Sequence, residues 1–334
     1  MVKSQFLIQE KLVLGGFKIL TILKNKIYEG YRISKEDAIA LINTALSELC
    51  KTANEIREHF CKDQFDICTI INGKCGNCSE ACKYCAQSIK YNTNIDKHPL
   101  CDTETILNDA KYNADKGIMR YSVVTSGKRL SPKDLDELCI TYKELNEKVD
   151  ISLCASHGLL SYDDFVKLKE SGVLRYHNNL ETSRNFFPHI CTTHTYDEKI
   201  KTIKDAQRAG LEVCSGGILG LGESMEDRID MLLDLRDLNI KSIPVNVLNP
   251  IKGTPLENNT PLTKEEILKS IAIFRFIIPD AFIRLAGGRG LFDDKGKSAF
   301  TSGANAAISG DMLTTSGITI QDDLNMLSDL KFQI

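Results

Sequence analysis

The chain has 334 residues, of which 42% are hydrophobic, so it can form one large barrel or two domains of ordinary size. Its net charge of −3 gives no reason to expect nucleic acid or an anionic membrane as a partner. No apolar run reaches the roughly 18 residues of a membrane-spanning helix, and the N-terminus lacks the layout of a signal peptide. We therefore expect a cytoplasmic protein.

The N-terminal residues are predicted to form a helical extension. The stretch over residues 6–23 is apolar but is interrupted by charged side chains, which is typical of an amphipathic helix lying on a domain. The strand patterns begin only after this region. We therefore expect a helical extension over residues 1–60 and a single catalytic domain over residues 61–334.

From residue 61 onward, strand patterns alternate with helical patterns. The predicted strands cover residues 66–71, 121–127, 150–156, 173–180, 212–219, 242–250, 281–288 and 305–310. The clearest helical patterns cover residues 131–145, 161–172 and 263–278. Eight strands with intervening helices predict a parallel (β/α)8 barrel, and a doubly wound open sheet is the competing fold.

Several predicted strands carry small polar or sulfur-containing side chains on one face. In the strand over residues 150–156, Ser152, Cys154 and Ser156 share a face because side chains alternate along a strand. Comparable residues on other predicted strands are Cys68, Cys214, Asn246 and Arg284. The interior of an ordinary barrel is filled with branched aliphatic residues. We therefore expect a barrel with a chemically reactive interior.

The sequence contains 12 cysteines, which in a reducing compartment favours metal binding over disulfides. Cys78, Cys82 and Cys85 have the spacing C-x3-C-x2-C in the loop after the first predicted strand. Three thiolates can hold three corners of a [4Fe–4S] cluster and leave the fourth iron open for a substrate. Two alternatives include Cys75: a zinc site of two C-x2-C pairs, or a four-cysteine cluster of the ferredoxin type.

With Tyr84 before its last cysteine, this motif resembles that of the radical S-adenosylmethionine superfamily. Over residues 60–315 the chain further resembles the biotin synthase family. The segments that carry this resemblance are CSEACKYCAQS (78–88), YHNNLETS (176–183), THTYDEKIKTIKDAQRAGLEVCSGGILGLGES (193–224), VNVLNPIKGTPL (245–256) and IRLAGGRG (283–290). The family converts dethiobiotin to biotin by inserting sulfur at two unactivated carbons. The resemblance implies a homodimer of (β/α)8 barrels, a [4Fe–4S] cluster, S-adenosylmethionine and an auxiliary iron–sulfur cluster that supplies the sulfur.

The resemblance also implies roles for individual residues. Cys78, Cys82 and Cys85 match the ligands of the radical cluster. The residues that match the S-adenosylmethionine site are Tyr84, Asn179, Glu181, Gly216, Ile218 and Gly220, with Glu181 where aspartate is usual. Asn179 and Asn246 match amides that contact the ureido group of dethiobiotin. A buried amide suits a neutral urea because it can both donate and accept a hydrogen bond.

The auxiliary cluster is where the sequence departs from the family pattern. Cys154, Cys214 and Arg284 match three of its four usual ligands, but the fourth, a cysteine, is replaced by Ser122. Serine is a poor substitute for a thiolate. Cys68 stands on the neighbouring strand where serine is usual, so we expect Cys68, Cys154 and Cys214 to hold a [2Fe–2S] cluster or a larger one. A buried cysteine that only fills space is the alternative for Cys68.

Two rival functions remain open on the sequence. One is a different radical enzyme with a similar barrel, such as a hydrogenase maturase or methylornithine synthase, although these lack the set of Cys154, Cys214 and Arg284. The other is a non-catalytic iron–sulfur electron carrier. The family resemblance implies a flavodoxin- or ferredoxin-like electron donor.

Cys191, in the loop over residues 189–193, is a spare thiol. We expect it at the active-site end of the barrel, where the loop with the C-x3-C-x2-C motif also lies.

Overall fold

The computed structural model describes residues 18–310 and 317–334, and in this part of the chain nine strands form one parallel sheet. They are β1 (Asp66–Lys74), β2 (Arg120–Thr125), β3 (Ser152–Ser156), β4 (Arg175–His177), β5 (Glu212–Cys214), β6 (Gly217–Leu219), β7 (Ser242–Val247), β8 (Phe282–Leu285) and β9 (Ala306–Ile308). Their order is β5-β4-β3-β2-β1-β9-β8-β7-β6. β5 also pairs with β7, where Cys214 lies opposite Ser242, and this pairing closes the sheet into a barrel.

Each of the eight predicted strands has a counterpart, and the fifth, over residues 212–219, is divided into β5 and β6. The division lies at Gly216, where the chain passes close to the backbone of β7. A Cβ atom at Gly216 would lie 1.9 Å from the carbonyl oxygen of Pro244, so only glycine fits there. The prediction of a (β/α)8 barrel is confirmed, and the closed sheet shows that the doubly wound alternative was wrong.

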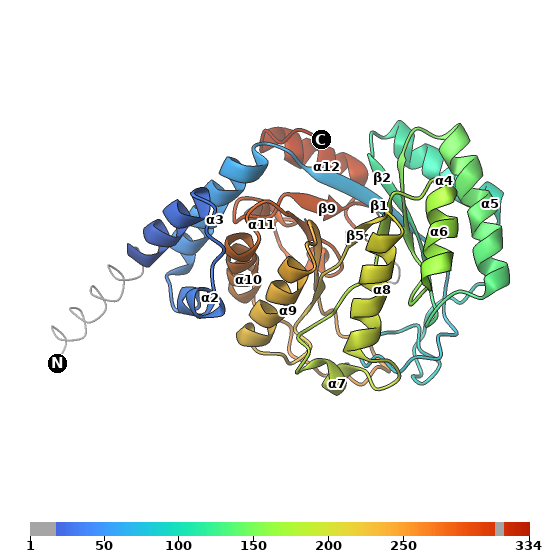
Figure 1. Ribbon diagram of the computed structural model, residues 1–334, viewed down its shortest axis with the longest axis horizontal. Helices are drawn as coiled ribbons and strands as arrows, with labels where there is room; N and C mark the ends of the chain where they lie inside the picture. Colours follow the sequence, from blue (N-terminus) through green and yellow to red (C-terminus); the bar gives the residue numbers. More distant parts are fainter. Residues whose placement is uncertain (1–17, 311–316) are drawn as a thin grey trace.

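Helices follow the strands and surround the barrel (Figure 1). They are α4 (Thr103–Asp115), α5 (Pro132–Lys148), α6 (Tyr162–Glu170), α7 (Phe187–Ile190), α8 (Tyr196–Arg208), α9 (Met225–Asp237), α10 (Lys264–Ile277), α11 (Lys297–Phe300) and α12 (Ile320–Asp329), with a 3-10 turn over Arg289–Leu291. The three predicted helices correspond to α5, α6 and α10. Both α6 and α10 begin at a capping box, formed by Ser161 with Asp164 and by Thr263 with Glu266, which satisfies the free amides of the first turn.

The N-terminal helices pack on the outside of the barrel at one end of the molecule, beside α10 (Figure 1). They are a first helix described over residues 18–28, α2 (Lys35–Leu41) and α3 (Leu46–Cys61). The first helix buries Leu20, Leu23 and Ile27, as expected for an amphipathic helix. Most of the predicted helix over residues 6–23 lies outside the described residues.

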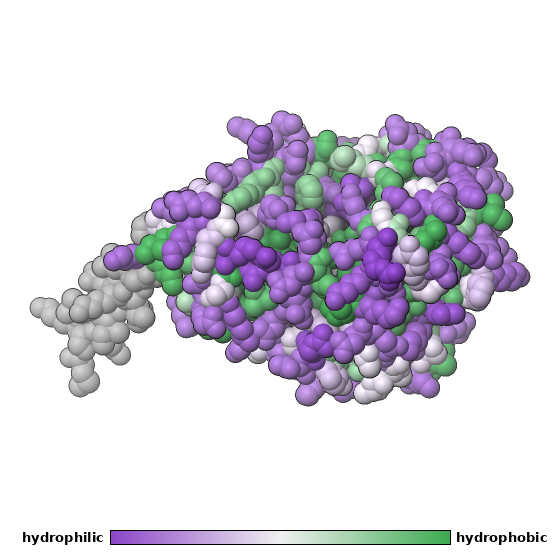
Figure 2. All heavy atoms as spheres, viewed as in Figure 1, coloured by the Kyte–Doolittle hydropathy of each residue, from purple (hydrophilic) through white to green (hydrophobic). Residues whose placement is uncertain are grey.

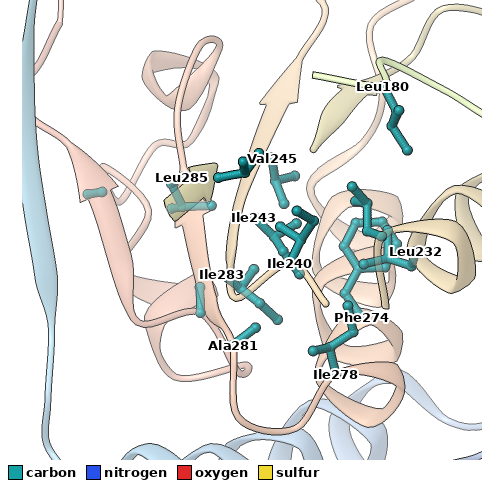
Figure 3. Packing of buried hydrophobic residues seen from close by; sticks show 14 of the residues in the cluster. Leu180, Leu232, Ile240, Ile243, Val245, Phe274, Ile278, Ala281, Ile283 and Leu285 are labelled. Atoms are coloured by element: carbon teal, nitrogen blue, oxygen red, sulfur yellow. The ribbon is translucent and has the colours of Figure 1, made fainter. Parts of the chain in front are cut away.

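The outer faces of the strands form the hydrophobic core with the surrounding helices. Figure 3 shows a part of this core in which side chains of β7 and β8 lie among those of the helices. These residues are Ile243, Val245, Ile283 and Leu285 from the strands, and Leu232 and Phe274 from α9 and α10. The intervening residues Pro244, Asn246, Arg284 and Ala286 face the interior of the barrel instead.

On the face shown in Figure 2, hydrophilic residues predominate, with apolar residues interspersed among them. Among the described residues, no helix combines the length and the apolar character needed to cross a membrane.

Candidate active site

The barrel holds a cavity of about 360 Å3 that extends from the first residues of β2 and β4 to the loops after the strands. Most of the predicted site residues line it: Cys68, Tyr84, Cys85, Ser122, Cys154, Asn179, Glu181, Cys214, Ile218, Asn246 and Arg284. The sulfur-containing and polar side chains that the sequence places on one face of several strands therefore meet inside the barrel. The other predicted site residues are not part of the lining: Cys78, Cys82, Gly216 and Gly220.

The loop that carries Cys78, Cys82 and Cys85 follows β1 and is held by backbone hydrogen bonds. The amide of Cys78 donates to the carbonyl of Gln87 at 3.0 Å, and the carbonyl of Cys78 accepts from Ile89 at 2.9 Å. The amide of Cys85 donates to the carbonyl of Cys82 at 3.0 Å. The loop is thus folded back on itself with all three thiols at one end of the barrel.

Burial raises the pKa of the Cys85 thiol to about 11, so this ligand is protonated in the cluster-free protein. A metal must therefore displace a proton when it binds here.

A second segment, after α7, fastens the loop from the outside. The amide of Lys83 donates to the carbonyl of Ile190 at 2.9 Å, and the amide of Ala81 donates to the Thr193 hydroxyl at 3.0 Å. Cys191 lies in this segment, with its Sγ 3.7 Å from that of Cys82. The spare thiol therefore lies at the expected end of the barrel. Sequence spacing could not show that it contacts a particular cysteine of the motif.

Asn179 and Glu181 follow β4 and are coupled to the glycine-rich strand β5–β6. The side-chain oxygen of Asn179 accepts from the amide of Gly216 at 3.0 Å, and its NH2 group donates to the Glu181 carboxylate at 3.3 Å. Glu181 has a φ of +74°, a conformation uncommon for a residue other than glycine. Burial and then the negative charge of Glu181 raise the pKa of Tyr84 well above its ordinary value. The phenol and the carboxylate thus border the same part of the cavity.

Asn246 bridges two strands from the wall of the cavity. Its NH2 group donates to the carbonyl of Gly217 at 3.1 Å, and its oxygen accepts from the amide of Gly287 at 2.9 Å. An amide side chain has two N–H donors and two lone pairs, so one of each remains for a ligand. The two backbone contacts fix the orientation in which they are presented.

The floor of the cavity is formed by Cys68, Cys154 and Cys214, with Ser122 and Arg284. Burial raises the pKa of Cys68 to about 11 and that of Cys154 to about 12. Burial would also raise the pKa of Cys214, but a hydrogen bond from His177 and the charges of Arg284 and Arg175 outweigh it and lower the value to about 7. Cys214 is therefore the floor thiol that ionises most readily.

Arg284 contacts both a thiol and a carboxylate. Its Nη1 donates to the Sγ of Cys68 at 3.2 Å, and its Nη2 lies 2.9 Å from Oδ1 of Asp66. The salt bridge that would by itself account for a buried arginine is therefore present. The same guanidinium nevertheless lines the cavity and points at Cys68, the cysteine that the sequence places on the neighbouring strand.

Sequence reasoning missed the cluster of charges at the floor of the cavity. Asp66 Oδ2 lies 3.1 Å from Arg120 and 3.2 Å from Arg175, in addition to the contact with Arg284. Burial would raise the pKa of Asp66, but the three guanidinium groups outweigh it and hold the value well below its usual range. A signal was present, because Asp66 and Arg120 stand two residues before Cys68 and Ser122 and so share their faces.

The donor chemistry of both sets fits iron–sulfur clusters, because thiolates are the soft ligands that hold them. The loop supplies three thiols, and so does the floor. The excess positive charge of the arginines at the floor would offset the negative charge of thiolate ligands. Cys75 is buried at the end of β1, where its backbone pairs with His98.

Two family models match the chain. The radical SAM superfamily matches residues 74–235, and the biotin and thiamin synthesis associated domain matches residues 244–333. The chain is 58% identical to a biotin synthase of Clostridium botulinum over 316 residues, covering 95% of this chain and 99% of that protein. It is also 58% identical to a biotin synthase of Akkermansia muciniphila over 312 residues, covering 93% and 97%.

Solved structures share the fold at low sequence identity. Methylornithine synthase superposes with a TM-score of 0.79 at 18% identity, covering 93% of this chain and 96% of that chain. The [FeFe]-hydrogenase maturase HydG from Carboxydothermus hydrogenoformans gives 0.79 at 16% identity, covering 99% and 82%. These likenesses concern the barrel alone, whereas identity above one half over nearly the whole length decides the family. The chain belongs to the biotin synthase family of radical S-adenosylmethionine enzymes.

Proposed function

We propose that this enzyme converts dethiobiotin to biotin within the cavity. A radical cluster would lie at the mouth of the cavity, which is the end formed by the loop with Cys78, Cys82 and Cys85. A sulfur-donating cluster would lie at the floor. The observation that carries the proposal is that Cys85 of the loop and the three floor cysteines line one cavity of about 360 Å3. A substrate in that cavity would lie between the two sets of cysteines. The membership of the biotin synthase family supports the choice of dethiobiotin.

Cys78, Cys82 and Cys85 would hold the [4Fe–4S] cluster. When bound, this cluster and S-adenosylmethionine together supply a 5′-deoxyadenosyl radical that can abstract hydrogen from an unactivated carbon. Tyr84, Asn179, Glu181, Gly216, Ile218 and Gly220 would form the binding site of S-adenosylmethionine. The strained backbone at Glu181 supports this role, because strain concentrates where the surrounding structure fixes a functional group.

Cys68, Cys154 and Cys214 would hold the auxiliary cluster, with Arg284 beside them. The 3.2 Å contact between Arg284 and Cys68 supports this set, because it places Cys68 where the guanidinium faces the cavity. Ser122 lines the same cavity but offers a harder oxygen donor. The chain would thus retain a thiolate on β1 in place of the one on β2.

Asn179 and Asn246 would recognise the ureido group of dethiobiotin. Each already uses one donor and one acceptor on the backbone or on Glu181, which orients the remaining N–H and lone pair toward the cavity. Because a urea carries both a carbonyl and N–H groups, two fixed amides can pair with it without a formal charge.

The remaining features of the proposal concern organisation and partners. The end of α3 at Cys61, before β1 begins at Asp66, supports a division into an extension over residues 1–60 and a barrel over residues 61–334. The family resemblance supports a homodimer, a cytoplasmic location and a flavodoxin- or ferredoxin-like electron donor. An electron carrier without catalysis is excluded by the family.

The ligand set is tested by comparing two substitutions on neighbouring strands. Cys68→Ser should lose the auxiliary iron and sulfide and with them biotin formation, because an alcohol is a poor ligand for iron–sulfur clusters. Ser122→Ala should retain both. Iron, sulfide and Mössbauer spectra of the anaerobically reconstituted proteins measure the outcome. A Cys68→Ser protein with its full auxiliary iron would refute the proposed set.

A further inference from the structure

Three side chains with metal-binding atoms meet just outside the cavity, where the segment after α7 contacts the cysteine loop. The Sγ atoms of Cys82 and Cys191 are 3.7 Å apart, and the ring nitrogens of His194 lie 3.3 and 3.7 Å from the Sγ of Cys191. The ligand atoms of all three residues lie within 4.8 Å of one another. Cys191 and His194 have no part in the proposed function.

Two of these spacings, that between the two sulfurs and that between Cys191 and the imidazole, agree with one tetrahedral ion. With Zn–S bonds of about 2.3 Å, two thiolates on one zinc ion lie about 3.8 Å apart, and a thiolate and an imidazole lie about 3.6 Å apart. The alternative bond between the two sulfurs, a disulfide, has a length of about 2.05 Å. The observed 3.7 Å excludes a disulfide; it is the length of an S–H···S hydrogen bond between the two thiols, and it equals the spacing of two ligands of one ion.

The surroundings of His194 are those of a metal-binding histidine. Its Nδ1 lies 2.7 Å from the carboxylate of Glu80, and the two side chains are only 7% and 9% exposed. A carboxylate that holds one ring nitrogen fixes the tautomer and presents the other nitrogen to a metal. The ring of Phe187 packs edge-on against the imidazole at 5.6 Å. The imidazole is thus oriented, and Nε2 is the ligand atom.

We propose that the cluster-free protein binds one thiophilic divalent cation, such as zinc, through Cys82, Cys191 and His194. Glu80 orients the imidazole, and the fourth tetrahedral position is left to water. A terminal thiolate serves one metal centre, so occupation of Cys82 by this ion excludes the radical cluster. That consequence rests on the proposed function, which assigns Cys82 to the cluster, whereas the binding itself does not.

The test is metal binding by the full-length, reduced, cluster-free protein under anaerobic conditions. Zinc is titrated against a chromophoric chelator, and cobalt is used as a spectroscopic probe of thiolate ligation. Cys191→Ser and His194→Gln should weaken binding at this site by about 100-fold, and Glu80→Gln by about tenfold, as expected for an outer partner of a metal ligand. Cys85→Ser is the matched control, because it removes a loop thiol outside the trio and should leave the affinity unchanged.

Two results would overturn the proposal: Cys191→Ser binding zinc as tightly as the unmodified protein, or Cys85→Ser losing as much affinity as Cys191→Ser. The second would place the ion on the cysteines of the loop motif. The use of both Cys191→Ser and His194→Gln guards against a single variant that fails to fold.

A second readout separates this inference from the proposed function. Zinc added before reconstitution should slow assembly of the radical cluster in the unmodified protein, and should not slow it in Cys191→Ser. If Cys82→Ser assembles a complete radical cluster and cleaves S-adenosylmethionine, the assignment of Cys82 fails. If Cys82→Ser loses the cluster but Cys191→Ser and His194→Gln leave the zinc affinity unchanged, only the proposed zinc site is refuted.

Discussion

The cysteines at the mouth of the barrel and those at its floor are held in place by different means. Cys78, Cys82 and Cys85 lie on a loop, are half-buried, and depend on hydrogen bonds within the loop and to the segment after α7. Cys154 and Cys214 are buried on strands, where the pairing with neighbouring strands fixes them. A loop can adapt to a cluster as it binds, whereas a strand presents its ligands already positioned.

The electrostatic settings differ as well. At the floor, three arginines surround one buried aspartate, Asp66, and Arg284 donates to the thiol of Cys68. At the mouth, the groups next to the thiols are a phenol, Tyr84, and the carboxylates of Glu80 and Glu181. The floor thiols thus lie among arginines, whereas the loop thiols lie near carboxylates.

The largest expected effect comes from removing one thiol from each set. Cys85→Ala should abolish both 5′-deoxyadenosine and biotin, because no radical is made. Cys154→Ala should abolish biotin while 5′-deoxyadenosine still forms, because only the sulfur source is lost. Chromatography of both products measures this split. Cys139→Ser, on α5 away from the cavity, is the control and should form both. Formation of biotin by Cys154→Ala would contradict the assignment of the sulfur source to the floor cysteines.

The next largest effect concerns the stability of the floor. Asp66→Asn should lower the free energy of unfolding of the cluster-free protein by about 3–5 kcal/mol, because it leaves buried guanidinium groups without their carboxylate. Glu144→Gln, which breaks an exposed pair with Lys148, should leave the free energy of unfolding almost unchanged, because solvent screens such a pair. Urea unfolding measures both. Equal losses of stability in the two variants would show that the ion pairs of Asp66 do not stabilise the barrel.

The same carboxylate predicts how stability depends on pH. The native pKa of Asp66 is held well below its ordinary value, so its contribution is fully present above about pH 4 and is lost as the pH falls toward the native value. Asp66→Asn should therefore unfold with a shallower loss of stability under acid. Identical acid profiles for the two proteins would contradict this assignment.

The smallest expected effect concerns the substrate between the two regions. Asn246→Ala should raise the KM for dethiobiotin about tenfold, because one buried hydrogen bond is worth about 1–2 kcal/mol. Yields of 5′-deoxyadenosine without substrate should stay the same, since both clusters are untouched. Asn325→Ala, an exposed change on α12, is the control. An unchanged KM would remove Asn246 from the substrate site.

The two regions were predictable from the sequence to different degrees. Alternation along the strands identified Cys154, Cys214, Asn246 and Arg284 as residues facing the interior, because the period of two is a property of every strand. The motif spacing identified the loop cysteines. What one strand cannot show is which residues meet when the barrel closes.

The charges around Asp66 and the contact of Cys191 with Cys82 illustrate this limit. Asp66 meets guanidinium groups 54, 109 and 218 residues away, and Cys191 meets a thiol 109 residues away. The division of the predicted strand over residues 212–219 has the same origin, because it depends on how closely Gly216 passes Pro244 of the neighbouring strand. These features depend on which strands and loops meet when the barrel closes.

We propose that the sulfur that enters biotin is sulfide of the auxiliary cluster held by the floor cysteines. It is tested most directly by reconstituting the protein with isotopically heavy sulfide, removing free sulfide, and allowing one turnover with S-adenosylmethionine, reductant and dethiobiotin. We expect the biotin formed to carry the heavy sulfur, as measured by mass spectrometry. Biotin with sulfur of natural isotopic composition would contradict it.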